Sequence, residues 1–302
     1  MSAESALPVR RLERCLSCGS ARWTALPLRY EFRGSFPLVE CRGCGLRFLA
    51  VQPTAVGLAE LYGASYFQRD FRCGRAAGDS FVESAFVAEN AGLLDAFERL
   101  GRPGRLLEVG CAAGWLLKHA AARGWTARGV ELSAEAVRQA RGAGLEVFEG
   151  DLLAAALPAE AFDLVYLGDV LEHVPDCVAV LAEIARVLRR GGHLYLRGPI
   201  TTHSIARRLA LATWGLARRT IVLREPPYHL WEFTPRSLAE LFRRAGLEVV
   251  SLEQSKIPPG RPHGDKTSLQ RAIMNGIDAV NAPWTRAFNA LGDRVVIVGR
   301  KR

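Results

Sequence analysis

Two hydrophobic patterns alternate along the C-terminal two-thirds of the chain. Short apolar runs bounded by glycine or acidic residues are typical of buried strands, and segments with apolar residues at helical spacing separate them. The runs predict strands at 105–108, 126–131, 145–149, 162–168 and 193–197, with helices at 116–123, 134–142 and 177–190. Because strands alternate with helices at this spacing, we expect an α/β fold with a parallel sheet wound on both faces.

The same patterns predict how the fold is completed. Strands at 247–252 and 294–299 bring the expected sheet to seven strands. Gly191-Gly192 is expected to stop helix 177–190, and Thr234-Pro235 to form the N-cap and first turn of a helix at 236–245. A further helix with arginines along one side is predicted at 204–223.

Two Cys-x-x-Cys-Gly motifs lie near the N-terminus, at 15–19 and 41–45. Each motif turns two sulfurs toward one point, and zinc prefers four thiolates in a tetrahedron. Disulfides need an oxidising compartment, whereas residues 1–20 show no secretory signal pattern. We therefore expect a cytoplasmic protein with a structural Zn²⁺ site, closed to substrate, whose ligands are Cys15, Cys18, Cys41 and Cys44.

These features divide the chain into three parts. A small N-terminal zinc-ribbon module is expected at 1–53, a helical connector or lid at 54–100, and the α/β domain at 101–302, which carries substrate-side inserts at 200–230 and 254–292. The connector contains four aromatic residues that either cover a ligand or pack in the core: Tyr62, Tyr66, Phe67 and Phe71.

Composition limits the function only loosely. The chain has 302 residues, 49% of them hydrophobic, and a formal net charge of +9. This charge is compatible with an anionic substrate, a membrane surface or RNA, and it selects none of them. No apolar run reaches the roughly 18 residues of a membrane span.

A small-residue turn follows the first strand of the expected sheet. Gly110 and Gly114 let the backbone approach a ligand there. Glu131 follows by about 20 residues, the interval that separates such a turn from a ribose-binding acid. A nicotinamide dehydrogenase is disfavoured because it needs the fuller Gly-x-Gly-x-x-Gly pattern and gives no role to Asp169–His173.

Five motifs in order carry a family resemblance, at 107–114, 129–133, 149–152, 162–176 and 183–192. Together they resemble class I S-adenosylmethionine-dependent methyltransferases, which implies a doubly wound Rossmann-like sheet of seven strands. The resemblance implies that the methionine part of the cofactor contacts Glu108, Gly110, Ala112 and Gly114. It also implies that the ribose contacts Glu131 and Leu132, the adenine Asp151 and Leu152, and the sulfonium Asp169 and Val170.

The acceptor is less constrained. The segment His229–Pro235 resembles a His-x-x-x-Phe-Thr-Pro motif of small-molecule methyltransferases, so His229 and His173 are our candidates for a general base. Amino-directed relatives carry Asn/Asp-Pro-Pro-Tyr where this chain has Gly168–Leu171, which favours a hydroxyl or carbon acceptor. We expect a sugar, glycan or other specialised metabolite, anionic or lipid-linked.

Two alternatives remain open at this level. The order of zinc module and methyltransferase domain also resembles zinc-containing ribosomal RNA methyltransferases, although nucleic acid is not favoured. A non-catalytic scaffold that only binds the cofactor is the other. The arginines of 204–223 are compatible with a lid for diphosphate groups, with a membrane-contacting face, or with a solvated helix surface.

Overall fold

The computed structural model of the chain describes residues 6–62, 80–256, 276, 279 and 281–302. Contacts between Cα atoms divide the chain into two compact units. The first unit comprises Met1–Thr54, Arg197–Leu241 and Ser251–Ile297, and the second comprises Ala55–Leu196, Phe242–Val250 and Val298–Arg302. The domain boundaries expected from the sequence remain predictions.

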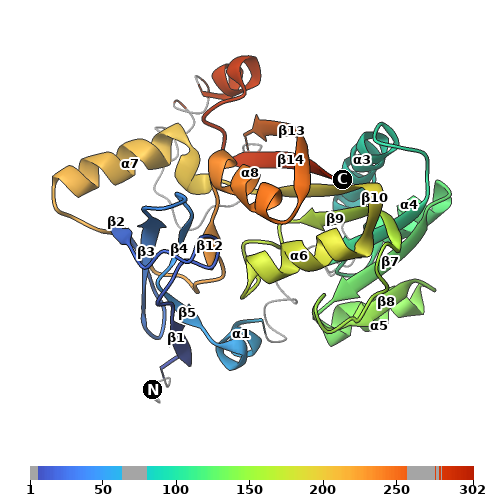
Figure 1. Cartoon of the computed structure of the whole chain (residues 1–302), viewed down its shortest axis with the longest axis horizontal. Helices are drawn as coiled ribbons and strands as arrows, with labels where there is room; N and C mark the ends of the chain where they lie inside the picture. The colour runs from blue at the N-terminus through green and yellow to red at the C-terminus, as the bar shows by residue number, and fades with distance from the viewer. Residues whose placement is uncertain (1–5, 63–79, 257–275, 277–278, 280) are drawn as a thin grey trace. The chain divides into compact units, whose positions relative to one another are not determined.

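A seven-stranded sheet has the order β13-β14-β10-β9-β6-β7-β8 (Figure 1). In its second-unit part, β6 pairs in parallel with β7 and with β9, and β7 pairs in parallel with β8. The carboxyl ends of these four strands therefore lie at one edge of the sheet. The seven strands are β6 (Arg105–Val109), β7 (Thr126–Glu131), β8 (Glu146–Glu149), β9 (Phe162–Gly168), β10 (Leu188–Pro199), β13 (Leu247–Ser255) and β14 (Arg294–Lys301).

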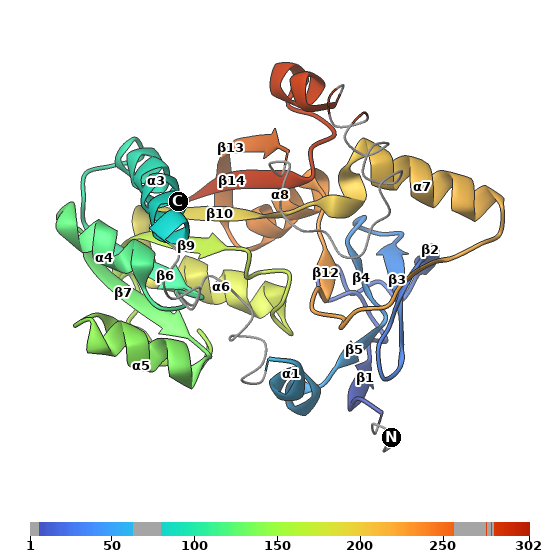
Figure 2. The same cartoon turned by 180° about the vertical axis from the view of Figure 1, so that it is seen from behind.

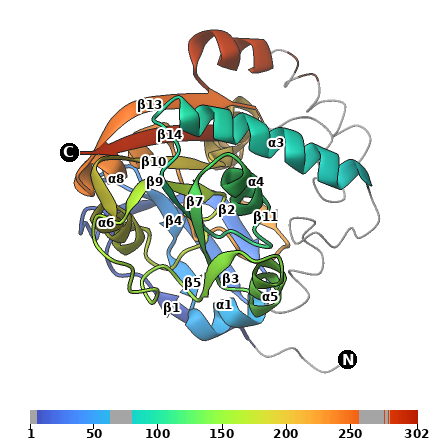
Figure 3. The ribbon, with the colours of Figure 1, turned by 90° about the vertical axis from the view of Figure 1, so that its right-hand side faces the viewer.

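Helices cover both faces of this sheet (Figure 3). The helices α4 (Trp115–Ala122) and α5 (Ala134–Gly142) lie on one face and α6 (Cys177–Val187) lies on the other. Long α3 (Ser80–Glu98) packs against α4, and short α1 (Ala55–Leu61) precedes it in the chain. The doubly wound α/β architecture predicted from the sequence is confirmed.

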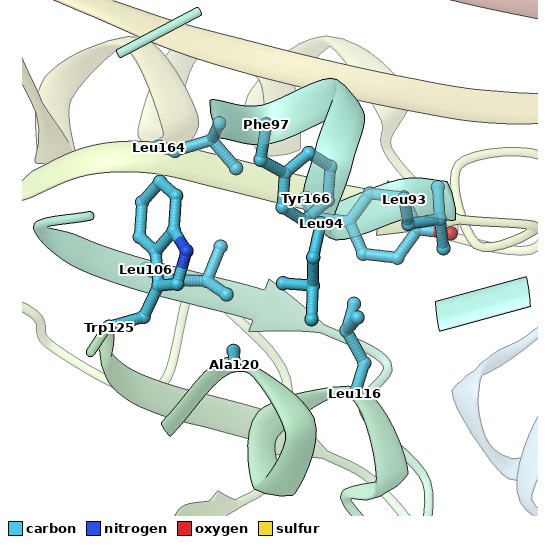
Figure 4. Packing of buried hydrophobic residues seen from close by; sticks show 9 residues of the cluster. All are labelled: Leu93, Leu94, Phe97, Leu106, Leu116, Ala120, Trp125, Leu164 and Tyr166. Atoms are coloured by element: carbon cyan, nitrogen blue, oxygen red, sulfur yellow. The ribbon is translucent and has the colours of Figure 1, made fainter. Parts of the chain in front are cut away.

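An apolar cluster joins α3, α4, β6 and β9 (Figure 4). Phe97 of α3 is fully buried, and its ring lies 5.4 Å from that of Tyr166 and 6.3 Å from that of Trp125. Leu106 is also fully buried, and Leu164 of β9 is 2% exposed. This packing gives a rigid base to the strand ends where the sequence motifs lie.

The element bounds confirm most of the predicted pattern, and two of the differences have clear causes. Helix α6 ends at Val187, and β10 already begins at Leu188, so the prediction of a helix to residue 190 is wrong. Gly192 lies within the strand, where a Cβ would sit about 3 Å from the backbone oxygens of Arg189, Phe162 and Asp163. The glycine therefore serves a close approach of two strands and not a helix stop.

The predicted helix at 204–223 is also too long. Helix α7 spans Ile205–Leu216, with Ser204 as its N-cap, and the short strand β11 (Ile221–Leu223), which begins with two β-branched residues, follows it. By contrast, helix α8 (Pro235–Arg244) begins as expected, because Thr234 Oγ1 accepts a hydrogen bond from the Ser237 N–H at 3.1 Å.

Three N-terminal strands and two later strands form a second, five-stranded sheet with the order β11-β2-β3-β4-β12 (Figure 2). Its strands are β2 (Trp23–Glu31), β3 (Ser35–Cys41), β4 (Arg47–Leu49), β11, and β12 (Trp231–Glu232). Strand β11 pairs in parallel with β2, and β12 pairs antiparallel to β4. Strands that precede β6 in the chain thus pair with strands that lie between β10 and β13, a pairing that the sequence patterns do not predict.

Smaller elements complete the first unit. Strands β1 (Val9–Arg11) and β5 (Val51–Pro53) form an antiparallel pair, and a 3-10 helix η2 (Thr201–His203) precedes α7. Helix α7 contacts both η2 and β2. Among the described residues, no helix is both long and apolar enough to cross a membrane.

Candidate functional site

The turn between β6 and α4 has left-handed backbone at three positions. Gly110, Ala112 and Gly114 have φ angles of 74°, 48° and 78°. The N–H groups of Gly110 and Cys111 both donate to Val130 O, at 2.8 and 3.3 Å, and so attach the turn to the end of β7. Glycine suits the first and third positions because it adopts positive φ without a Cβ clash.

Gly110 also lies directly against the segment that follows β9. A Cβ placed on Gly110 would be 2.5 Å from Val170 Cγ2. Asp169, the residue before Val170, has a φ of 57°, an unusual value for a residue with a side chain. The ends of β6 and β9 therefore meet closely, as expected for the ligand-binding edge of an open α/β sheet.

The Glu131 carboxylate is held by two backbone groups. Its Oε2 accepts a hydrogen bond from the Ala112 N–H at 2.9 Å, and its Oε1 accepts one from the Ser133 N–H at 2.8 Å. The side chain is only 7% exposed. A buried carboxylate that accepts backbone N–H bonds is fixed in position at the carboxyl end of β7.

The other predicted cofactor residues lie at the same strand ends with different exposure. Glu108 of β6 is buried, and Leu152, after β8, is 2% exposed. Asp151 is exposed, and its Oδ1 accepts the Ala154 N–H at 2.8 Å. Leu132 is 66% exposed, so it presents an apolar side chain to solvent beside Glu131.

His173 lies in the second unit, close to a hydroxyl and a carboxylate. Its Nδ1 is 2.8 Å from the Tyr62 hydroxyl, and its Nε2 is 3.7 Å from Glu172 Oε1. Tyr62 is the only described member of the predicted aromatic cluster, since Tyr66, Phe67 and Phe71 lie outside the described residues. Both ring nitrogens of His173 therefore face polar partners.

His229 lies in the first unit, beside a buried carboxylate that sequence reasoning missed. Its Nδ1 is 3.8 Å from Glu232 Oε1. The same carboxylate accepts hydrogen bonds from the Tyr30 hydroxyl at 3.4 Å and from Thr201 Oγ1 at 3.1 Å. A Glu three residues after a His in an extended segment gives no sequence signal, because that spacing is meaningful only on a helix.

The contacts between Tyr30, His229 and Glu232 explain the pKa shifts of Glu232 and Tyr30. Burial opposes ionisation of Glu232, but the interactions with His229 and Thr201 outweigh it and lower the pKa of Glu232 below its ordinary 4.5. Burial and the Glu232 charge raise the pKa of Tyr30. Glu232 is therefore an anion at neutral pH, while Tyr30 keeps its proton and donates it in a hydrogen bond.

The two cysteine motifs fold into matching turns. The Gly19 N–H donates to Cys15 O at 2.8 Å, and the Gly45 N–H donates to Cys41 O at 2.9 Å. Both glycines are left-handed, with φ of 72° and 75°. Each turn brings its two sulfurs to the same side of the chain.

The four sulfurs form one compact cluster. Cys15 Sγ lies 3.6 Å from Cys44 Sγ, and Cys18 Sγ lies 3.5 Å from Cys41 Sγ. All four sulfurs lie within 4.8 Å of one another, and none is in a disulfide. Four sulfurs about 2.3 Å from a tetrahedral zinc are separated by about 3.8 Å, so the cluster fits this metal.

The pKa shifts of the clustered thiols differ in direction. Burial opposes ionisation of Cys41, but the N–H groups of Cys44 and Gly43 outweigh it and lower its pKa to about 7. Burial raises the pKa of Cys15 and of Cys18. Without a cation, the clustered sulfurs would therefore not all ionise together.

Comparison with known proteins identifies the family. A family model described as "Methyltransferase domain" matches residues 83–252, more than half of the chain. The chain is 32% identical, over 51% of its length and 67% of the relative's, to a ubiquinone biosynthesis O-methyltransferase from Ralstonia nicotianae.

Solved structures share the fold. A SAM-dependent methyltransferase from Archaeoglobus fulgidus matches 72% of this chain and 94% of its own, with a TM-score of 0.50 and 18% identity. A SAM-dependent methyltransferase from Thermotoga maritima, described as a possible histamine N-methyltransferase, matches 81% of this chain and 99% of its own, with a TM-score of 0.50 and 21% identity. From the family match and the sheet topology together, the chain belongs to the class I S-adenosylmethionine-dependent methyltransferases.

Proposed function

We propose that this enzyme methylates a hydroxyl oxygen, or a carbon, of a small-molecule acceptor such as a sugar, a glycan or another specialised or lipid-linked metabolite. The observation that carries the proposal is the His229–Glu232 pair, because an imidazole beside a buried carboxylate, which stabilises its protonated form, is suited to take a hydroxyl proton. Similarity to a relative named as an O-methyltransferase supports an oxygen acceptor.

S-adenosylmethionine, when bound, supplies a methyl group made electrophilic by the sulfonium. We propose that Glu131 accepts hydrogen bonds from the ribose hydroxyls, with Leu132 beside it. Each carboxylate oxygen has two lone pairs, so the bonds from Ala112 and Ser133 leave acceptor capacity for the ribose. The fixed orientation of this buried carboxylate reduces the entropy that binding costs.

The remaining cofactor contacts follow the order of the strands. Gly110 and Gly114 carry no side chain in the turn after β6, and this supports a close approach of the methionine part to the backbone of the turn. We propose Asp169 and Val170 as neighbours of the sulfonium, since a carboxylate stabilises a cation. The other proposed contacts are Glu108, Gly110, Ala112 and Gly114 for the methionine part, and Asp151 and Leu152 for the adenine.

We propose His229 as the proton acceptor, with Glu232 holding its Nδ1 side. His173 is the second candidate, because Tyr62 and Glu172 contact its two ring nitrogens in a similar way. If the acceptor attacks through carbon, either imidazole can instead take the proton that the carbon loses. Positioning of the acceptor supplies a further part of the rate.

We also propose that the four-cysteine cluster holds a structural Zn²⁺. The separations between the four sulfurs support four cysteine ligands arranged around one metal ion. Four protein ligands leave no open coordination position, so the metal would stabilise the module and take no part in methyl transfer.

The proposal is tested by incubating the full-length enzyme with methyl-labelled S-adenosylmethionine and three separate pools: nucleotide sugars with other small hydroxylated metabolites, lipid extract, and ribosomal RNA. Label bound through oxygen or carbon is expected in the small-molecule or lipid pool, and digestion with hydrolases locates the atom. Label in the RNA pool alone would contradict the proposal, as would methylation of nitrogen.

A further inference from the structure

A pocket of about 150 Å³, lined by both polar and apolar side chains, lies entirely within residues of the first unit. One wall comes from strands of the five-stranded sheet, with Leu28 and Tyr30 on β2 and Leu223 on β11. Strand β2 is anchored to the cysteine cluster, because its first residue, Trp23, pairs with Cys41 on β3. The module that carries the proposed zinc therefore forms one side of this pocket.

Other lining residues carry most of the hydrogen-bonding groups. Thr201 and Thr202 of η2 and Arg207 of α7 line the pocket, together with His229 and Glu232. The Glu232 carboxylate is 4% exposed, and it already accepts bonds from Thr201 and Tyr30. A carboxylate can accept about four hydrogen bonds in total, so it retains capacity for a ligand donor.

Thr202 supplies a separate sign of a ligand. The residue is 1% exposed, and its Oγ1 has no hydrogen-bond partner among the described residues. By contrast, the backbone carbonyl of Thr202 accepts a hydrogen bond from the Arg47 guanidinium at 3.1 Å. This bond fixes the backbone at Thr202. Buried hydroxyls without partners are rare in folded proteins, and Thr202 is one of the residues that line the pocket.

We propose that this pocket binds a vicinal diol of the methyl acceptor, with Thr202 Oγ1 and Glu232 contacting neighbouring hydroxyls and His229 facing one of them. This inference rests on the proposed function. Hydroxyls both donate and accept, as the mixture of carboxylate, imidazole and hydroxyl groups in the pocket requires. Leu28 and Leu223 then contact the C–H surface of the ligand.

Pyranose sugars and catechols both carry vicinal diols, and two probes distinguish them. Binding of methyl α-D-glucopyranoside and of catechol to the full-length zinc-containing protein is measured by saturation-transfer NMR, with S-adenosylhomocysteine present. We expect one of the two probes to bind. Binding by the glucoside assigns the diol to a sugar, and binding by catechol assigns it to an aromatic ring.

Substitutions locate the binding. Thr202→Val removes the hydroxyl and keeps a similar side-chain volume. We expect it to lower the affinity for the probe by about fivefold to tenfold, the effect of one lost hydrogen bond. The matched control is Thr213→Val, because Thr213 is exposed on α7 and its hydroxyl donates within its own helix, to Leu209 O at 2.9 Å and Ala210 O at 3.2 Å. Tyr30→Phe tests the wall from the cysteine module and should also weaken the probe.

The outcomes separate this inference from the proposed function. Failure of both probes to bind, or equal binding by Thr202→Val and Thr213→Val, overturns the diol pocket. Labelling of small-molecule hydroxyls that survives unchanged in Thr202→Val overturns the pocket but leaves the proposed function standing. Label only in RNA, together with specific diol binding, overturns the role of the pocket in methyl transfer and the proposed function.

Discussion

The Ala112 N–H donates to Glu131 Oε2 at 2.9 Å, so the turn after β6 and the acid that ends β7 form one hydrogen-bonded structure. The sequence spacing predicts a turn and a carboxylate about 20 residues later, but it does not predict a contact between them. Their direct contact means that the position of Glu131 depends on the backbone of the turn, and that the turn depends on Glu131. Changes at either position should therefore affect cofactor binding.

Gly110→Ala should destabilise the protein and weaken cofactor binding. The new Cβ would meet Val170 Cγ2 at 2.5 Å, and the residue would have to keep a φ of 74°. Together these effects should cost about 2 kcal/mol in the free energy of unfolding, measured by urea denaturation. The control is Gly142→Ala at the end of α5, where a Cβ meets no atom within 4 Å. Equal stability of the two variants would argue against the tight contact.

Cys41→Ser should remove the metal and destabilise the five-stranded sheet, because a structural zinc site contributes folding free energy directly. Metal content by plasma mass spectrometry and the unfolding midpoint report the two effects. Cys177→Ala is the matched control, since Cys177 is fully buried in α6 outside the cluster and its loss should leave the zinc in place. A Cys41→Ser protein with full zinc content would refute the assignment of this ligand.

Glu232→Gln should change the acid limb of the stability curve. Since the folded-state pKa of Glu232 is lowered below its ordinary 4.5, its ionised form stabilises the fold above about that pH. The contribution is lost as the pH falls through the folded pKa. The wild type should therefore lose stability more steeply in acid than the variant. Glu248→Gln, at an exposed surface pair with Arg302, should keep the wild-type slope.

His229→Gln should lower kcat for the labelled acceptor by about 10²-fold or more, the usual contribution of a general base. The affinity for S-adenosylhomocysteine should stay unchanged, because the change lies outside the proposed cofactor contacts. His193→Gln on β10 serves as the control. Should His173→Gln and not His229→Gln abolish transfer, the second candidate base would replace the first.

Local patterns predicted much of the α/β part of the fold. Strand β9 spans Phe162–Gly168 as expected, and the Thr234 cap begins α8 as predicted. Both are local signals, carried by apolar runs and by capping chemistry. The end of α6 was missed because Gly192 looks like a helix stop but serves a close strand contact, which depends on residues distant in sequence.

The candidate site was predictable only where motifs are contiguous. The turn residues and Glu131 follow family spacing, whereas the surroundings of His229 depend on strand β2 from the other end of the chain. The Tyr30 hydroxyl lies 3.4 Å from Glu232 Oε1, although the two residues are distant in sequence. No sequence pattern predicted that β11 and β12 would join the N-terminal sheet, so the pocket and Thr202 could not be found from the sequence alone.

The central claim is that carboxylates at the sheet edge hold the cofactor, and calorimetric titration with S-adenosylhomocysteine tests it most directly. The control is Glu135→Ala, because Glu135 is a partly exposed acid in the first turn of α5. This variant should bind S-adenosylhomocysteine with the same affinity as the wild type. Glu131→Ala, and Glu131→Gln with its similar shape, should bind about tenfold to a hundredfold more weakly while remaining folded. Wild-type affinity in both Glu131 variants would contradict the account.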